Sequence, residues 1–193
     1  MTIYSRLAAY YPCDTTHGRS LSEDAVGTNN ATAGVVSSAT GKVRQGMFFL
    51  SSRSQFRSVP NDSAIQGLLG VCCWVKFSTL SADMAIVSKG SDGTDANTSI
   101  KLWYDHSDTD LAFTVGDSSS STTIRTDGLS LAVDTWYHVR CYNDGNRMGI
   151  AVNGILYGSG TARAPLTETG LLYLGNDFSN NYFDGVLDEV ALF

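Results

Sequence analysis

The sequence lacks the features that define several large classes of protein. It contains 3 prolines in 193 residues, no run of basic residues and no long amphipathic helical pattern. Its formal net charge of -6 opposes non-specific binding to nucleic acid, because phosphates require a basic surface. No apolar stretch approaches the length of a membrane-spanning helix. We therefore expect neither a nucleic-acid partner nor insertion into a membrane.

The N-terminus lacks the pattern of a secretory signal. Residues 1–14 read MTIYSRLAAYYPCD, without a basic start followed by an uninterrupted apolar stretch. Because the sequence also begins with a methionine, we expect synthesis in the cytosol without a signal peptide.

Cysteines are few, and their spacing fits neither a disulfide framework nor a zinc site. Cys72 and Cys73 are adjacent and point to opposite faces of a predicted strand, while Cys13 and Cys141 occupy ordinary apolar positions. We expect four reduced, largely buried thiols. His138 is close to Cys141 in sequence, but the two side chains point to opposite strand faces, which argues against a thiol nucleophile.

The sequence is rich in short strand-like segments separated by glycine, serine and aspartate. This pattern, with 19 glycines, predicts an all-β protein with two antiparallel sheets in a sandwich. The length suits a single domain over residues 1–193. Strands are predicted at residues 7–11, 46–50, 55–59, 70–77, 84–89, 99–104, 111–115, 122–126, 172–175 and 186–193. The segments 46–50 and 55–59 are expected to pair as a hairpin, and residues 60–67 to contain one short helical turn.

Two hairpin signals, Asp144-Gly145 and Asn153-Gly154, lie within residues 136–158. Such dipeptides favour two-residue type I′ turns, so this stretch predicts a three-strand antiparallel meander. With Asp144 and Gly145 as the loop residues, Cys141 pairs with Met148.

The same register pairs Val139 with Ile150 and Tyr137 with Val152. The second turn places Ile155, Leu156, Tyr157 and Gly158 beside Val152, Ala151, Ile150 and Gly149.

One face of this meander has small residues between larger ones. Gly149 and Ala151 lie beside a strand that carries His138, Arg140 and Tyr142, which predicts a shallow trough. If the trough holds a sugar or a peptide, these three larger side chains are the candidate ligand-binding residues. A loop of the same chain or a neighbouring subunit can equally fill the trough, and such packing is the favoured interpretation.

Two tryptophans are candidate ligand platforms. Trp103 shares a strand face with Lys101, so we expect it to be partly exposed and able to stack on a sugar ring, unless it is a rim residue without function. Trp74 is expected to belong to the core.

Residues 14–34 form a long polar loop that needs an organiser. Asp14, Asp24, Asn29 and Asn30 supply hard oxygen ligands suited to calcium, and the alternative is a set of Asx turns. Asp188 in the last predicted strand also needs a partner. Backbone donors, Arg6, Arg19 or the same metal ion are the candidates.

Six segments in order resemble the laminin-G-like, concanavalin-A-like jelly rolls over nearly the whole chain. They are residues 10–14 (YYPCD), 24–27 (DAVG), 85–90 (AIVSKG), 136–139 (WYHV), 152–154 (VNG) and 182–190 (YFDGVLDEV). The resemblance implies that the first and last strands are adjacent, which would bring Asp14 and Asp24 towards Asp188. It also implies a structural calcium ion there, so the expected metal ligands are Asp14, Asp24, Asn29 and Asp188.

Catalysis is not expected. Glycoside hydrolases that use this fold carry Glu-x-Asp-x-x-Glu, which is absent here. Asp188 and Glu189 are consecutive, so we expect their side chains to point to opposite faces of a strand. No serine, histidine and aspartate occur in a compatible grouping.

Two non-enzymatic functions remain, and a glycoside hydrolase relative is the less favoured third. The first is a glycan- or surface-binding adhesion module, with His138, Arg140, Tyr142 and Trp103 as its site, displayed on a large assembly such as a phage virion. The second is a structural virion component, such as a decoration or tail protein, without glycan binding. The expected partner is accordingly a surface glycan or a neighbouring structural protein, and the second function also fits a homo-oligomer. Virion proteins reach the exterior by lysis, which accords with cytosolic synthesis and a virion-surface or other extracellular location.

Overall fold

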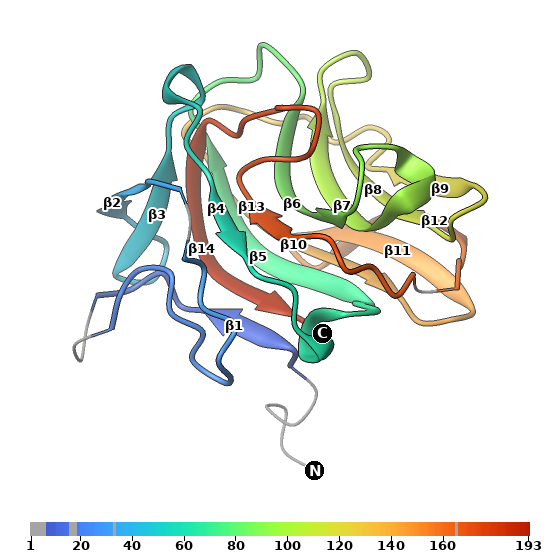
Figure 1. The fold of residues 1–193 in the computed structure, drawn as a ribbon. Coiled ribbons are helices and arrows are strands. Elements are labelled where there is room, and N and C mark those ends of the chain that lie inside the picture. The colour runs from blue at the N-terminus through green and yellow to red at the C-terminus, as the bar shows by residue number, and fades with distance from the viewer. Residues whose placement is uncertain (1–6, 16–18, 33, 165) are drawn as a thin grey trace.

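Two antiparallel sheets packed face to face make up the fold (Figure 1). The computed structural model describes residues 7–15, 19–32, 34–164 and 166–193. One sheet has eight strands in the order β12-β11-β10-β5-β14-β3-β2, with β1 also pairing with β14, and the other has six in the order β4-β13-β6-β7-β8-β9. The predicted all-β sandwich is confirmed, including the adjacency of the first and last strands.

The strands of the eight-stranded sheet are β1 (Ala9–Tyr11), β2 (Ser37–Thr40), β3 (Gln45–Phe49), β5 (Gly70–Phe77), β10 (Trp136–Asn143), β11 (Arg147–Val152), β12 (Ile155–Thr161) and β14 (Gly185–Leu192). Those of the six-stranded sheet are β4 (Arg57–Val59), β6 (Met84–Gly90), β7 (Thr98–Asp105), β8 (Asp110–Gly116), β9 (Ser121–Arg125) and β13 (Leu172–Leu174). Short 3-10 helices lie at Ser51–Arg53, Ser63–Ile65 and Asp95–Asn97, so the helical turn expected in residues 60–67 is confirmed. Within the described ranges, no helix has the length and apolar character needed to span a bilayer.

The core lies between the sheets and follows the alternation of the strands. In β5, Val71, Val75 and Phe77 are fully buried on the inner side. Burial of each such side chain stabilises the fold by about 1.5–3 kcal/mol. Trp74 faces outwards and is partly exposed, so its predicted place in the core is wrong. All four cysteines are free thiols, and Cys72 alone among them is not fully buried, as expected.

The segments predicted as a hairpin at residues 46–59 belong to different sheets. β3 pairs with β14 and β2, whereas β4 pairs with β13. The reason is the connection, in which the 3-10 turn Ser51–Arg53 ends at Ser54 in the left-handed conformation. This turn carries the chain from one sheet to the other.

The predicted meander of β10, β11 and β12 is present, but its first register is displaced by two residues. Cys141 pairs with Ile150 rather than with Met148. The Asp144 carboxylate accepts hydrogen bonds from the backbone N–H groups of Asn146 and Arg147, which makes Gly145 and Asn146 the central turn residues. Because the displacement is an even number, each side chain keeps its predicted face.

The second turn has the predicted pairs Val152–Ile155 and Ala151–Leu156. A bulge then places Gly158, instead of Tyr157, beside Ile150. A β-carbon on Gly158 would lie 2.1 Å from the carbonyl oxygen of Arg125, so only glycine permits this close approach of β12 to β9.

A bulge in β14 overturns the predicted faces of the last strand. The pairing of β14 with β5 shifts between Asp188 and Ala191, and Glu189 adopts a left-handed φ of 52°. Regular alternation would direct the Glu189 side chain between the sheets, whereas the bulge returns Val190 to the buried side. Asp188 and Glu189 therefore both lie outside the core, contrary to the prediction of opposite faces.

Candidate functional site

The outer face of the eight-stranded sheet carries three pairs of a cation and an aromatic ring. The Lys42 and Lys76 ammonium groups lie 4.7 and 5.3 Å from the ring centroids of Trp74 and Trp136. The Arg140 guanidinium lies 5.4 Å from the centroid of Tyr142. Contacts at these distances are favourable cation–π interactions. We call this surface the cation–ring face, formed by Lys42, Trp74, Lys76, Trp136, His138, Arg140 and Tyr142.

The pairing of β5 with β10 assembles this face. Trp136 lies opposite Lys76 and His138 opposite Trp74, two residues apart on each strand. The rings of Trp74 and His138 consequently lie with their centroids 4.9 Å apart. The structure thus brings the predicted residues His138, Arg140 and Tyr142 to one surface.

The cations of this face have no carboxylate partner among the described residues. Lys42, Lys76 and Arg140 form no ion pair there. Asp188 pairs with Trp74 across the strands, but its side chain is fully buried. In a chain of net charge -6, this surface therefore presents positive charge beside aromatic rings.

Backbone donors, one of the predicted alternatives, satisfy Asp188. Its carboxylate accepts hydrogen bonds from the N–H groups of Val43 at 2.7 Å and Glu189 at 2.9 Å. Burial, with a smaller contribution from the charge of Glu189, raises the pKa of Asp188 to about 7. Arg19 instead pairs with Glu23, and Arg6 lies outside the described residues.

The predicted trough beside Gly149 is filled from within the chain. A β-carbon at Gly149 would lie 2.4 Å from the Tyr142 ring, so the ring occupies the space above the glycine. A cavity of about 490 Å³ is found instead beside Arg140 and Tyr142, with Leu69 and Phe193 among its other lining residues. Two of the three predicted binding residues thus border an open site.

A thiol–imidazole contact on this face escaped the sequence analysis. Cys72 Sγ lies 3.1 Å from His138 Nε2, whereas Cys141 is buried on the opposite side of the sheet. Burial raises the pKa of the Cys72 thiol and lowers that of His138, so both groups favour their neutral forms. A neutral thiol is a weak nucleophile, and this pair does not form an activated one.

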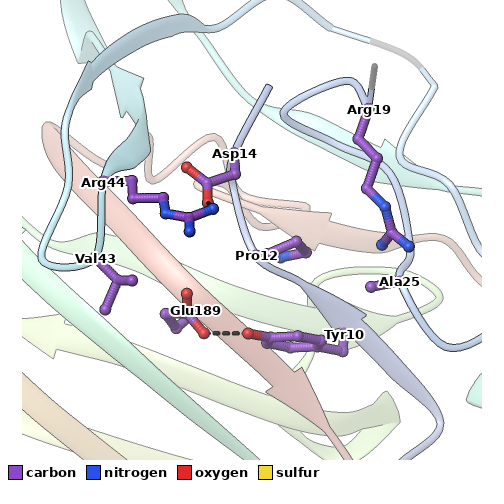
Figure 2. A pocket seen from close by; sticks show the side chains of 8 residues that line it. All are labelled: Tyr10, Pro12, Asp14, Arg19, Ala25, Val43, Arg44 and Glu189. Atoms are coloured by element: carbon purple, nitrogen blue, oxygen red, sulfur yellow. Dashed lines mark hydrogen bonds and ion pairs between the residues drawn. The ribbon is translucent and has the colours of Figure 1, made fainter. Parts of the chain in front are cut away.

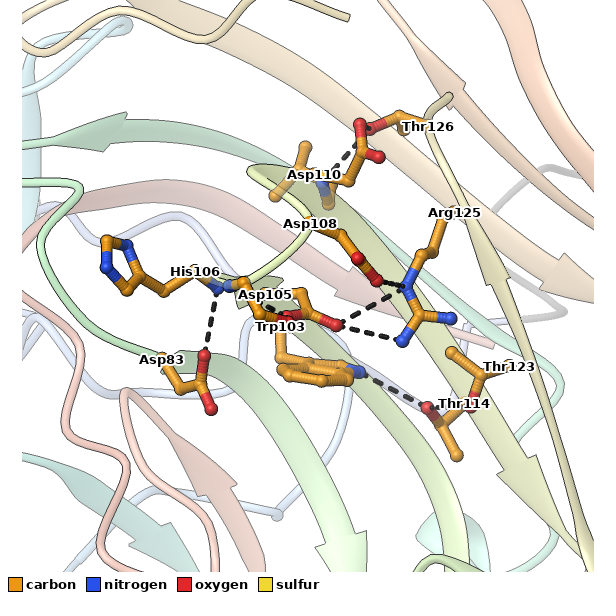
Figure 3. Close-up of polar contacts among 12 residues, drawn as sticks. Asp83, Trp103, Asp105, His106, Asp108, Asp110, Thr114, Thr123, Arg125 and Thr126 are labelled. Atoms are coloured by element: carbon orange, nitrogen blue, oxygen red, sulfur yellow. Dashed lines mark hydrogen bonds and ion pairs between the residues drawn. The ribbon is translucent and has the colours of Figure 1, made fainter. Parts of the chain in front are cut away.

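Trp103 lies on the outer face of the six-stranded sheet (Figure 3). It is partly exposed and shares its face with Lys101, as predicted, and the ammonium group lies 4.6 Å from its ring centroid. Its indole N–H donates to Thr114 Oγ1 at 3.2 Å, and Lys101 also pairs with Asp177 at 2.9 Å. The polar groups around Trp103 thus already have partners within the chain.

The charged side chains close to Trp103 also form ion pairs within the chain (Figure 3). Arg125 pairs with Asp105 at 2.8 Å and with Asp108 at 2.7 Å. Burial alone would raise the pKa of Asp105, but hydrogen bonds from Arg125 and Ser107 bring this pKa below its usual value. This part of the surface is a closed ionic network.

The predicted metal ligands make hydrogen bonds within the chain. The Asp24 carboxylate accepts hydrogen bonds from the N–H groups of Tyr10, Val26 and Asn29, as in the alternative of Asx turns. Asp14 accepts one from the Gln45 N–H. These N–H groups occupy part of the carboxylate lone pairs that a cation would otherwise use.

The Asn29 amide, for its part, donates to the Ala8 carbonyl. Across the described part of the chain, no three histidine, cysteine, aspartate or glutamate side chains gather as a metal ion would need.

Comparisons with known proteins agree with the architecture. Residues 52–193 match the family model described as Concanavalin A-like lectin/glucanases superfamily. No curated protein matches the chain in sequence.

Solved structures with similar folds come from several sources. Domain 4 of AbnA, a GH43 extracellular arabinanase from Geobacillus stearothermophilus solved with arabinotriose, is 20% identical, with a TM-score of 0.77 over 96% of this chain and 91% of that one. The binding domain of Paraclostridial Mosquitocidal Protein 1 is 14% identical, with a TM-score of 0.76, and all of this chain spans 49% of it. Domains LG4-5 of the mouse laminin alpha1 chain are 17% identical, with a TM-score of 0.59 over 82% of this chain and 41% of that one.

Proposed function

This chain belongs to the concanavalin A-like lectin/glucanases superfamily, and on that basis we propose that it is a non-catalytic module that binds glycans through the cation–ring face. The observation that carries the proposal is the set of three cation–ring pairs without carboxylate partners among the described residues. Aromatic rings stack on the C–H faces of sugars, and charged N–H groups donate to sugar hydroxyls. The arabinotriose bound by a domain of similar fold supports this assignment.

The arrangement of carboxylates favours binding over hydrolysis. Asp188 is fully buried beneath residues 41–44 and bonded to backbone N–H groups, so it does not reach a glycosidic bond. Glu189 accepts a hydrogen bond from the Tyr10 hydroxyl. Hydrolysis needs two accessible carboxyl groups on either side of the bond, and this pair leaves one inaccessible.

Glycan binding by the wild type, Arg140→Ala and Trp103→Ala tests the proposal. A glycan array identifies the ligand, and calorimetry measures its affinity for the three proteins. We expect Arg140→Ala to weaken binding about tenfold or more and Trp103→Ala, the matched control on the other sheet, to leave the affinity unchanged. Equal affinity of the wild type and Arg140→Ala would remove the assignment to the cation–ring face.

Display on a large assembly such as a phage virion forms the second part of the proposal. Free thiols accord with cytosolic synthesis, and Ile155 and Leu156 are 60% and 55% exposed at the β11–β12 turn, as a docking contact would need. A purely structural virion role predicts self-association through these residues and no glycan binding. Size-exclusion chromatography with light scattering on the wild type and Leu156→Ser distinguishes the two roles.

A further inference from the structure

The turn between β2 and β3 brings Lys42 to the cation–ring face. In the described part of the chain, β2 is the outermost strand of its sheet and pairs only with β3. The Gly41 N–H donates to the Arg44 carbonyl oxygen at 3.0 Å, and Lys42 and Val43 are the exposed central residues of the turn. A hairpin tip at the edge of a sheet has few contacts that hold it in place. The position of Lys42 over Trp74 therefore needs a further link to the sheet.

Asp188 of β14 supplies this link. Its Oδ2 atom accepts a hydrogen bond from the Val43 N–H at 2.7 Å, and the Lys42 N–H also hydrogen-bonds to this carboxylate. A β-carbon on Gly41 would lie 2.7 Å from the same Oδ2 atom, so the turn lies directly on the carboxyl group. Val43 and Glu189, the residue after Asp188, line one cavity of about 400 Å³ (Figure 2). The turn and β14 are thus in contact along this side of the sheet.

Asp188 also lies beside the other member of the pair. It is the cross-strand partner of Trp74, and the Lys42 ammonium group lies 4.7 Å from the centroid of the Trp74 ring. Among the described residues, Asp188 has no cation partner, and its burial disfavours the charged form. Neither a salt bridge nor apolar packing explains a carboxyl group at this position, whereas its hydrogen bonds to the turn do.

We propose that Asp188 is a positioning residue of the cation–ring face, which holds the turn of residues 41–44 against β14 so that Lys42 stays over Trp74. The Asp188 side chain is fully buried and acts through Lys42, not on a ligand. Because Lys42 is held in advance, it donates to a sugar on this face with a smaller loss of conformational entropy. This inference rests on the proposed glycan-binding function and adds to it a residue beneath the binding surface.

NMR of the Lys42 side chain tests this placement without any glycan. The ring current of an indole shifts protons above its face upfield. The Lys42 side-chain protons should therefore be shifted in the wild type and should lose the shift in Asp188→Ala. Asp188→Asn keeps an acceptor for the turn and should rescue the shift. Lys76, which lies over Trp136 and is not part of the turn, is the internal control and should keep its shift in both variants.

Calorimetry tests the effect on binding, with the glycan that gives the strongest array signal and with arabinotriose as a second probe. Lys42→Gln and Asp188→Ala should each weaken binding about three- to tenfold. The double variant should bind no more weakly than either single variant, because both changes remove the same cation from the surface. Asp188→Asn should restore most of the affinity. A purely structural role for Asp188 would instead make the two losses multiply.

A Lys42 shift that persists in Asp188→Ala would overturn the inference, as would losses of affinity that multiply in the double variant. Thermal unfolding checks that each variant folds. If Asp188→Ala does not fold, Gly41→Ala takes its place, since the added methyl group would lift the turn from the carboxyl group and should likewise remove the shift. A retained shift there would count equally against the inference.

The two measurements also separate this inference from the function on which it rests. A Lys42 shift that depends on Asp188, in a protein that binds no array glycan, would remove the proposed function and leave Asp188 as the residue that places Lys42. Glycan binding that depends on Arg140, with a Lys42 shift that ignores Asp188, would leave the proposed function standing and remove the inference.

Discussion

The two outer faces of the sandwich hold their positive charges in opposite ways. Around the six-stranded sheet, Lys101, Arg125 and Arg163 each pair with an aspartate at 2.8 to 2.9 Å. On the eight-stranded sheet, Lys42 and Arg140 lie over aromatic rings instead. An ion-paired cation has its interactions satisfied within the chain, whereas a cation over a ring keeps N–H donors for a ligand. Exposed aromatics therefore need to be judged together with the partners of the charges around them.

The buried acids of the two sheets provide the largest contrast. Because the pKa of Asp188 is raised to about 7, the folded state holds a proton that the unfolded state releases near pH 4. Stability should therefore fall from pH 4 to pH 7, by up to roughly 4 kcal/mol. Asp188→Asn should flatten this decline, as measured by denaturant unfolding at several pH values.

Asp105→Asn is the matched control on the six-stranded sheet. In the wild type, the lowered pKa of Asp105 contributes stability above pH 4 that is lost as the pH falls further. The pH dependence of stability that Asp105 causes therefore has the opposite sign to that of Asp188. This variant should keep the decline between pH 4 and 7. A decline that persists in Asp188→Asn would show that another group causes it.

Removal of a cation should affect the two faces unequally. Arg125→Gln leaves the buried Asp105 without its ion pair and should cost about 1–3 kcal/mol of unfolding free energy. Lys42→Gln removes an exposed cation from Trp74 and should cost less than about 1 kcal/mol. Equal losses in chemical denaturation would contradict the contrast between the faces.

Gly149→Ala tests the filled trough with a smaller effect. The added methyl group would displace the Tyr142 ring, which is the movable end of a side chain, so stability should change by less than about 1 kcal/mol. Glycan affinity should fall a few-fold if the position of this ring matters. In a Tyr142→Ala background the same substitution should have no further effect on affinity, which calorimetry can establish.

Calcium should have the smallest effect of all. The carboxylates of Asp14, Asp24 and Asp188 already accept backbone N–H groups, so the unfolding midpoint should be the same in calcium and in EDTA. A calcium-dependent rise would reveal a site that these hydrogen bonds do not predict.

Local patterns in the sequence predicted the faces of the strands better than their partners. Alternation placed His138, Arg140 and Tyr142 together, because it depends only on neighbouring residues. Trp74 and Lys42 join them through β5 and the β2–β3 turn, which are distant in sequence and gave no local signal.

The irregular positions were the least predictable. The bulge at Glu189 reverses the alternation within β14, and the hydrogen bonds of Asp144 move the turn by one residue. Retrospectively, the spacing of Leu187, Val190 and Leu192, whose buried side chains break strict alternation, is a signal for the bulge. The position of the Glu189 side chain outside the core follows from this bulge and was missed with it.

The position of β14 also has a consequence for folding kinetics. This strand is the last along the chain, yet it lies inside the eight-stranded sheet, with β5 on one side and β3 and β1 on the other. During synthesis, the ribosome must release residues 185–192 before the earlier strands can close around them. Such long-range pairing slows folding, so the nascent chain must keep its apolar strands from aggregating until its final strand arrives.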